Sequence, residues 1–218
     1  MATARSTTRT RPTIENGQLV EKWSVFGPKG AGGIAIADAD VDGVPEIYTI
    51  QYNSGRQRTE MVSYDNQGNR RWFCNAPISV LGYPSVGDLD GDGDGEIVVG
   101  KYICDHNGNR IVTTSLNHGS SYGSNPFFLE VTGGGDRELI SGMGVSASDG
   151  QTIFTGPGGR AAVADVDNDN LPELVIAKTS SGRIYVYDDG VFTGQNQNVD
   201  PEAHPELLWT GRFPSHML

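Results

Sequence analysis

Positive charge, long apolar segments and helical periodicity are all scarce in this chain. Only 16 Lys and Arg residues stand against 27 Asp and Glu residues, and the net charge of −11 argues against nucleic acid as a partner. No apolar run is long enough to cross a membrane, so we expect no membrane insertion. The four histidines lack the spacing of zinc ligands. Together with 30 glycines, these absences indicate an all-β fold rich in turns.

Cysteine is scarce as well, and Cys74 and Cys104 leave two states open. They fall in adjacent repeats of the pattern described below, which allows a disulfide between them. Free cysteines are often buried, where they pack as small apolar side chains. We expect this free and buried state for both.

Three Asp-rich loops recur along the chain, and each leads directly into a short apolar segment. All three have carboxylates at loop positions 1, 3, 5 and 9, in residues 38–46, 88–96 and 165–173. Alternate carboxylates on a tight turn can converge on one point, and Ca²⁺ takes about six to eight such oxygen ligands. The loops could also be solvated acidic turns, but the repeated positions favour metal sites.

An EF-hand is the obvious alternative, and the residues beyond the loops argue against it. An EF-hand needs flanking helices and a bidentate Glu at position 12 of its loop. That position is Thr49, Val99 or Ile176 here. The segments after the loops are rich in β-branched residues and predict strands. The expected unit is therefore a strand, a calcium loop and a second strand.

A second repeat consists of tight-turn signals in which Asp precedes Gly between extended segments. Their final glycines lie 40, 42 and 40 residues apart, in Asp65–Gly68, Asp105–Gly108, Asp149–Gly150 and Asp188–Gly190. Such residues favour hairpin turns because they tolerate positive φ. The two repeats together predict about four strands in every ~40 residues, which is typical of a β-propeller blade.

One unit of the pattern is degenerate. Phe127–Leu129 leads through a Gly-rich loop into Glu138–Ile140, and Thr132 and Gly134 stand where carboxylates belong. We therefore expect a blade at this place without a well-formed metal site.

The whole pattern resembles the FG-GAP/VCBS repeat family of integrin-like β-propellers, whose loops read Asp-x-Asp-x-Asp-Gly-x-x-Asp/Glu. The resemblance covers about residues 20–213, with Asn170 in place of the usual Gly in the third loop. Asn also adopts the left-handed conformation. The resemblance implies about three Ca²⁺ ions, bound by twelve carboxylates and three backbone carbonyls. The first site comprises Asp38, Asp40, Asp42, the carbonyl of Val44 and Glu46; the second Asp88, Asp90, Asp92, the carbonyl of Asp94 and Glu96; and the third Asp165, Asp167, Asp169, the carbonyl of Leu171 and Glu173.

The chain is expected to divide into a Thr/Arg-rich tail or linker, residues 1–18, and propeller repeats, residues 19–218. Residues 19–25 predict a lone strand that resembles the last strand of an earlier blade. About four blades follow, so the propeller could close with four blades, belong to a longer one, or be completed by another chain. Residues 1–13 of the tail have three Arg and no acidic residue, which favours self-association with the acidic body of a neighbour.

These features favour a non-catalytic extracellular recognition or adhesion module that binds a glycan or protein ligand. We expect no enzyme activity, because the proposed calcium sites already account for the paired carboxylates. Two alternatives stay open at this point. One is a self-assembling subunit of a surface filament or layer, and the other is a propeller fragment of a secreted polysaccharide lyase or hydrolase.

Overall fold

The computed structural model describes residues 21–25, 32–78, 82–118, 125–131, 135–178, 180–192 and 207–212. These residues form fifteen β-strands and a single 3-10 helix, η1 (Asp189–Phe192), with no α-helix among them. In the described ranges no helix has the length and apolarity needed to span a bilayer. The predicted all-β class is confirmed.

Four antiparallel sheets follow one another along the chain. Sheet 1 contains β1 (Ala35–Ala37), β2 (Glu46–Asn53), β3 (Arg58–Tyr64) and β4 (Arg70–Phe73). Sheet 2 contains β5 (Ser85–Gly87), β6 (Glu96–Cys104) and β7 (Arg110–His118). Sheet 3 contains β8 (Phe127–Leu129), β9 (Glu138–Ser141), β10 (Gly144–Ser146) and β11 (Thr152–Thr155). Sheet 4 contains β12 (Arg160–Ala164), β13 (Glu173–Lys178), β14 (Arg183–Tyr187) and β15 (Leu207–Arg212).

The expected four-stranded unit is present in three of these sheets, with the Asp-rich or degenerate loop between the first two strands. Sheet 2 differs because β6 is one continuous element where two strands were predicted. Its first half pairs with β5 and its second half with β7, and Gly100, at φ 64°, separates the halves. Asp188–Gly190 lead into η1 and form no tight hairpin turn, but β14 still pairs antiparallel with β15, the expected last strand of this sheet.

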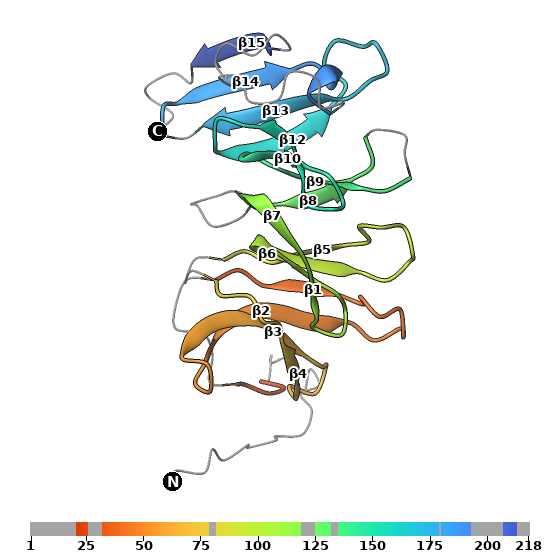
Figure 1. The fold of residues 1–218 in the computed structure, drawn as a ribbon, viewed down its shortest axis with the longest axis vertical. Coiled ribbons are helices and arrows are strands. Elements are labelled where there is room, and N and C mark those ends of the chain that lie inside the picture. Colours follow the sequence, from red (N-terminus) through yellow and green to blue (C-terminus); the bar gives the residue numbers. More distant parts are fainter. Residues whose placement is uncertain are drawn as a thin grey trace, which may run out of the picture.

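The sheets lie in chain order along the long axis of the molecule, so sheets 1 and 4 are at opposite ends (Figure 1). Neighbouring sheets meet through their early strands: β1 lies beside β5, β5 beside β8, and β9 beside β12. The loops that follow β1, β5 and β12 emerge on the same side of the stack, at the right of Figure 1. The sheet order therefore places the three Asp-rich loops in a row.

Apolar side chains fill the space between adjacent sheets, and β6 shows why. Successive residues of a strand point to opposite faces. Ile97 and Val99 pack in the cluster with sheet 1, whereas Val98 packs in the cluster that contains Leu139 of sheet 3. A strand covered on both faces reads as a continuous apolar run, as the segment after the second loop does.

A tryptophan–glycine contact between successive repeats recurs at two hairpin turns. Gly68 and Gly108 both have φ of 84°, and a Cβ on them would lie 2.8 and 2.6 Å from the rings of Trp23 and Trp72. Each indole N–H also donates to a carbonyl of the turn that it covers, at 3.1 Å for Trp23 and 2.9 Å for Trp72. The segment around Trp23 thus takes the place of an earlier outer strand. However, residues 21–25 are not in a strand, so that part of the prediction is wrong, and residues 1–20 lie outside the described residues.

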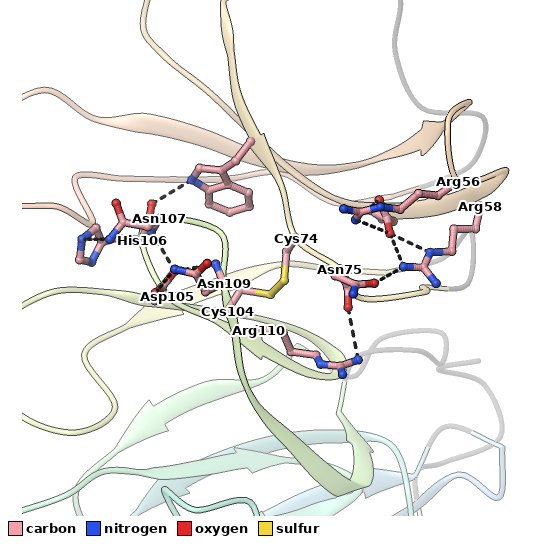
Figure 2. Close-up of a disulfide and its surroundings, with 12 residues drawn as sticks. Arg56, Arg58, Cys74, Asn75, Cys104, Asp105, His106, Asn107, Asn109 and Arg110 are labelled. Carbon is pink, nitrogen blue, oxygen red and sulfur yellow. Dashed lines mark hydrogen bonds and ion pairs between the residues drawn. A yellow bond between two sulfur atoms is a disulfide. The ribbon is translucent and has the colours of Figure 1, made fainter.

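The expectation of free cysteines is wrong, because Cys74 and Cys104 form a disulfide (Figure 2). Both are buried, and their Cα atoms are 6.5 Å apart. Cys74 follows β4 and Cys104 ends β6. Packing sheet 1 against sheet 2 brings these two strand ends together, and the sequence spacing alone does not reveal that proximity.

A buried histidine joins sheets 2 and 3. His118, at the end of β7, has ring nitrogens 2.7 Å from the hydroxyl of Ser141 and 2.9 Å from that of Ser146. Burial lowers the pKa of His118 to about 4. Its imidazole is therefore neutral at pH 7 and forms one hydrogen bond with each of the two hydroxyl groups.

Replacing both cysteines by serine should lower the free energy of unfolding by about 3–4 kcal/mol. Without the bond, the unfolded chain is no longer constrained by a closed loop of 30 residues and gains conformational entropy. Urea unfolding of the oxidised protein and the double variant measures the difference. Wild type treated with a reductant is the matched control and should lose a similar amount. Identical unfolding midpoints for oxidised and reduced wild type would contradict a structural role for the bond.

Stability should fall as the pH drops through the range set by His118. The imidazole of His118 takes up a proton near pH 6.5 in the unfolded chain but only near pH 4 in the folded chain. The contribution of His118 to the free energy of unfolding is therefore complete above pH 6.5 and is lost on acidification. Between pH 7.5 and pH 5 the loss should be about 2 kcal/mol. His118→Asn should be less stable at pH 7.5 and show a shallower pH dependence in urea unfolding. If the stability of the variant fell equally steeply with falling pH, titratable groups other than His118 would cause the pH dependence.

Candidate metal centres

A buried glutamate closes every loop between the first two strands of a sheet. Its carboxylate accepts a hydrogen bond from the backbone N–H seven residues earlier in the chain. The donors and distances are Ala39 to Glu46 at 3.4 Å, Leu89 to Glu96 at 2.6 Å, Val131 to Glu138 at 3.1 Å and Val166 to Glu173 at 2.5 Å. This contact fixes the two ends of each loop, including the degenerate one.

The first aspartate of each Asp-rich loop folds the backbone around itself. Asp38 accepts from the N–H groups of Asp42 and Gly43 at 3.0 and 2.8 Å. Asp165 accepts from Asn168 and Asn170 at 2.6 and 3.1 Å. Both asparagines have positive φ, 73° and 72°, so the expected left-handed conformation of Asn170 is confirmed. Such turns direct the alternate carboxylates toward one point.

Three acidic clusters that could hold a metal ion result, each with ligand atoms within 4.8 Å of one another. They comprise Asp38, Asp40 and Asp42; Asp88, Asp90 and Glu96; and Asp165, Asp167 and Glu173. Glu46, Asp92 and Asp169 lie outside these three groups, although the sequence placed them there. Asp169 instead groups with Asp167 and Asp188, and the sequence did not predict Asp188 as a ligand. The carbonyls of Val44, Asp94 and Leu171 stay predicted ligands.

The first loop contains its own positive charge. Arg71, from β4, places one guanidinium nitrogen 2.6 Å from Asp40 and another 2.6 Å from Glu46. Its hydrogen bond lowers the pKa of Asp40, and the same bond raises the pKa of Arg71. The hydroxyl of Tyr48 donates to the other oxygen of Glu46 at 3.1 Å. Glu46 is therefore already partnered, which explains its separation from the three aspartates.

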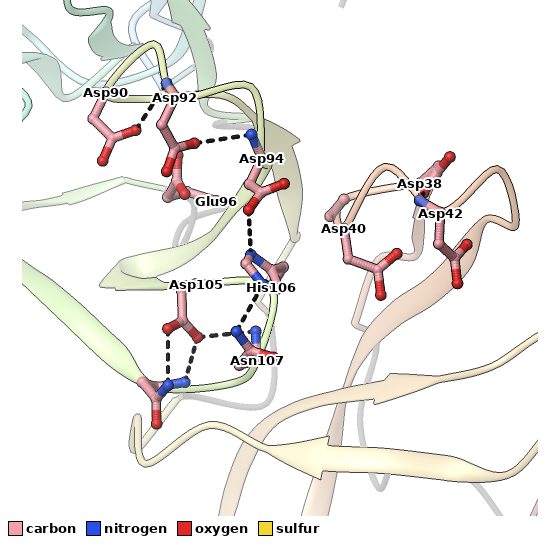
Figure 3. Close-up of polar contacts among 12 residues, drawn as sticks. Asp38, Asp40, Asp42, Asp90, Asp92, Asp94, Glu96, Asp105, His106 and Asn107 are labelled. Atoms are coloured by element: carbon pink, nitrogen blue, oxygen red, sulfur yellow. Dashed lines mark hydrogen bonds and ion pairs between the residues drawn. The ribbon is translucent and has the colours of Figure 1, made fainter.

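The second loop is partly neutralised from the next sheet. Arg137, just before β9, lies 2.9 Å from the carboxylate of Asp88 and also donates to its carbonyl. Burial raises the pKa of Glu96 to about 7, with a smaller contribution from the loop aspartates. Figure 3 shows Asp94 directed toward His106 of the next turn, where the Asp94 carboxylate is 3.4 Å from the ring. The sequence could not assign these partners to the loop, because they come from other elements.

The third loop lacks such compensation. No lysine or arginine of the described residues forms an ion pair with the carboxylates of Asp165, Asp167, Asp169 or Glu173. Glu173 is fully buried, and one of its oxygens has no hydrogen-bond partner. Burying an unpartnered carboxylate oxygen is unfavourable. A bound cation would satisfy it, so the residues of this loop fit a metal ion.

Comparison with known proteins supports the fold and leaves the family open. No protein-family model matches the chain, and no curated protein matches its sequence. The structure is similar to the V. cholerae biofilm matrix protein Bap1, with a TM-score of 0.61 and 21% identity over 83% of this chain and 28% of that one. A weaker similarity links it to the exotype rhamnogalacturonan lyase YesX, with a TM-score of 0.47 and 21% identity over 72% of this chain and 28% of that one. The chain thus spans about 28% of the length of each protein.

Replacing Glu173 by Gln should have opposite effects without and with calcium. The amide oxygen can still accept from the backbone of Val166, but the unpartnered charge is gone, so the melting temperature without calcium should rise. In calcium the variant should melt below wild type, and equilibrium dialysis should find about two ions per chain in place of about three.

Glu138→Gln is the matched control, because Glu138 accepts the same backbone hydrogen bond in the degenerate loop. It should leave the calcium-induced rise of the melting temperature unchanged. A Glu173→Gln variant that binds as much calcium as wild type would show that the third loop is only a solvated turn.

Proposed function

We propose that the protein is a non-catalytic, extracellular recognition or adhesion module stabilised by calcium. The observation that carries this proposal is the placement of the acidic groups. The carboxylates of each Asp-rich loop gather between two strands of one sheet and accept hydrogen bonds from the loop backbone. Groups arranged in this way hold a loop together around a cation and are not free to act as an acid and base on a substrate.

Calcium is the ion that suits this donor set best. Every side-chain ligand in the three clusters is a carboxylate oxygen, and hard oxygen donors in flexible loops favour Ca²⁺. Zinc would favour His or Cys ligands, and none is present in these clusters. Three ions would contribute six positive charges and reduce the formal net charge from −11 to about −5.

The four sheets support an FG-GAP/VCBS-like propeller arrangement. Adjacent sheets meet through their early strands, cores fill the space between them, and the Trp contact with a turn glycine recurs. Sheets 1 and 4 lie at opposite ends of the stack, so closure into a ring would need further blades (Figure 1). A longer chain or a second copy could supply them, which keeps self-association as an alternative role.

The disulfide supports the extracellular part of the proposal. Disulfides form and persist in oxidising compartments and are rare in the cytosol. Cys74 and Cys104 are both fully buried at a junction between sheets, as expected of a structural bond. An extracellular module whose acidic loops hold calcium is suited to binding glycans or proteins of a surface or matrix.

An array of polysaccharides and matrix proteins tests the proposal. In millimolar calcium the protein should bind at least one carbohydrate, and a chelator should weaken that binding because the loops lose their stabilising ions. Incubation with the bound polysaccharide should release neither reducing ends nor unsaturated products. Product release that increases with protein concentration would make the chain an enzyme, and binding to proteins alone would exclude carbohydrate recognition.

A further inference from the structure

A polar cleft of about 480 Å³ lies at the junction of sheets 1 and 2, beside the turn whose His106 contacts Asp94. Side chains that can bind an acidic, hydroxylated ligand line it. They are two arginines, three asparagines and an aromatic residue from the two sheets: Arg56, Arg110, Asn75, Asn107, Asn109 and Phe73. None of these residues belongs to the candidate metal sites.

The cleft is positively charged although the protein as a whole is acidic. Arg56 and the neighbouring Arg58 share one buried carboxylate, that of Glu60, at 3.1 and 2.7 Å. Arg110, on the opposite wall, forms no ion pair with any acid of the described chain, and it lies over the ring of Tyr102 at 5.6 Å. Three guanidinium groups against the carboxylates of Glu60 and of Asp105 on the second wall leave a local charge of about +1.

The nearest acid on the second wall is already occupied. Asp105 accepts backbone hydrogen bonds from Asn107 and Asn109 at 3.0 and 2.7 Å, and its second oxygen accepts from the side chain of Asn109 at 2.8 Å. Its charge is therefore spread over the turn. The guanidinium groups remain the dominant charges facing the cleft.

Asparagine amides supply the second half of the binding chemistry. Asn75 stands between the arginines: its side-chain oxygen accepts from Arg58, and its backbone carbonyl accepts from Arg110 at 3.3 Å (Figure 2). These two contacts leave the amide N–H groups of Asn75 available. An amide can both donate to and accept from a hydroxyl group, whereas a guanidinium fork fits a carboxylate.

The two walls are held at a fixed separation. The Cys74–Cys104 disulfide joins the residue before Asn75 to the residue before Asp105. The indole N–H of Trp72 donates to the backbone carbonyl of His106 at 2.9 Å, which ties β4 to the same turn. Rigid walls reduce the entropy lost when a ligand binds.

We infer that this cleft binds an acidic saccharide, with the carboxylate or sulfate group at Arg56 and Arg110 and the hydroxyl groups at the asparagine amides. The inference rests on the proposed recognition function and adds the place and the ligand class. A saccharide fits better than an acidic peptide because it presents hydroxyl groups next to its acidic group, and the amide N–H groups of Asn75 can bind them.

Arg110→Gln and Asn75→Ala test the site. Arg160→Gln is the matched control, because Arg160 is exposed on β12 of sheet 4 and does not line the cleft. The probes are an oligogalacturonate, a heparin oligosaccharide, neutral dextran and polyglutamate, each titrated in calcium by calorimetry. Arg110→Gln should weaken binding of the acidic saccharide at least about tenfold, because a charge-assisted hydrogen bond is lost. Asn75→Ala should weaken it less, and Arg160→Gln should not change it. Melting temperatures equal to that of wild type exclude misfolding as the cause.

The outcomes distinguish a failure of the cleft inference from a failure of the proposed recognition function. A preference for the oligogalacturonate or the heparin fragment identifies a carboxylated or sulfated source, and either supports the inference. Acidic saccharide binding that Arg110→Gln leaves intact overturns the cleft but not the recognition function. Equal affinity for polyglutamate overturns the saccharide class. Binding of dextran as tight as that of the acidic probes also overturns it, while a lack of binding to all carbohydrates removes the proposed carbohydrate recognition itself.

Discussion

A buried glutamate hydrogen-bonded to the backbone seven residues earlier is the constraint on which the loops and sheets depend. It occurs at the start of the second strand in all four sheets, at Glu46, Glu96, Glu138 and Glu173. The contact closes each loop onto the sheet and sets the register between its first two strands. It also brings a negative charge into the protein interior, where a carboxylate requires a partner.

The chain meets this electrostatic demand differently in each Asp-rich loop. Arg71 bridges two carboxylates of the first loop, and Arg137 reaches the second loop from the neighbouring sheet. The third loop has neither, and an oxygen of Glu173 stays without a partner. Loops that look equivalent in sequence are therefore neutralised to different extents by other parts of the chain, and the third is neutralised least.

Stacking of the sheets creates a second kind of surface where sheets 1 and 2 meet. The packing that buries Ile97 and Val99 against sheet 1 also aligns the ends of β4 and β6, where the disulfide forms. The hairpin turn after β6 then faces the end of β4, and arginine and asparagine side chains from both sheets line the space between them. The cleft lies between two sheets, whereas each Asp-rich loop lies between two strands of one sheet.

Local sequence patterns determined the all-β class, most strand positions, the loop between the first two strands of each sheet, and three acidic clusters. These features depend on residues close together in the chain, such as Asp165 and Asn170, whose backbone contacts form within a single loop. Tertiary packing alone decided the disulfide, the arginines that neutralise the first two loops, the position of Asp188 and the cleft. In each case the partners belong to different strands, turns or sheets, and their distance depends on how apolar faces stack, which spacing along the chain does not specify.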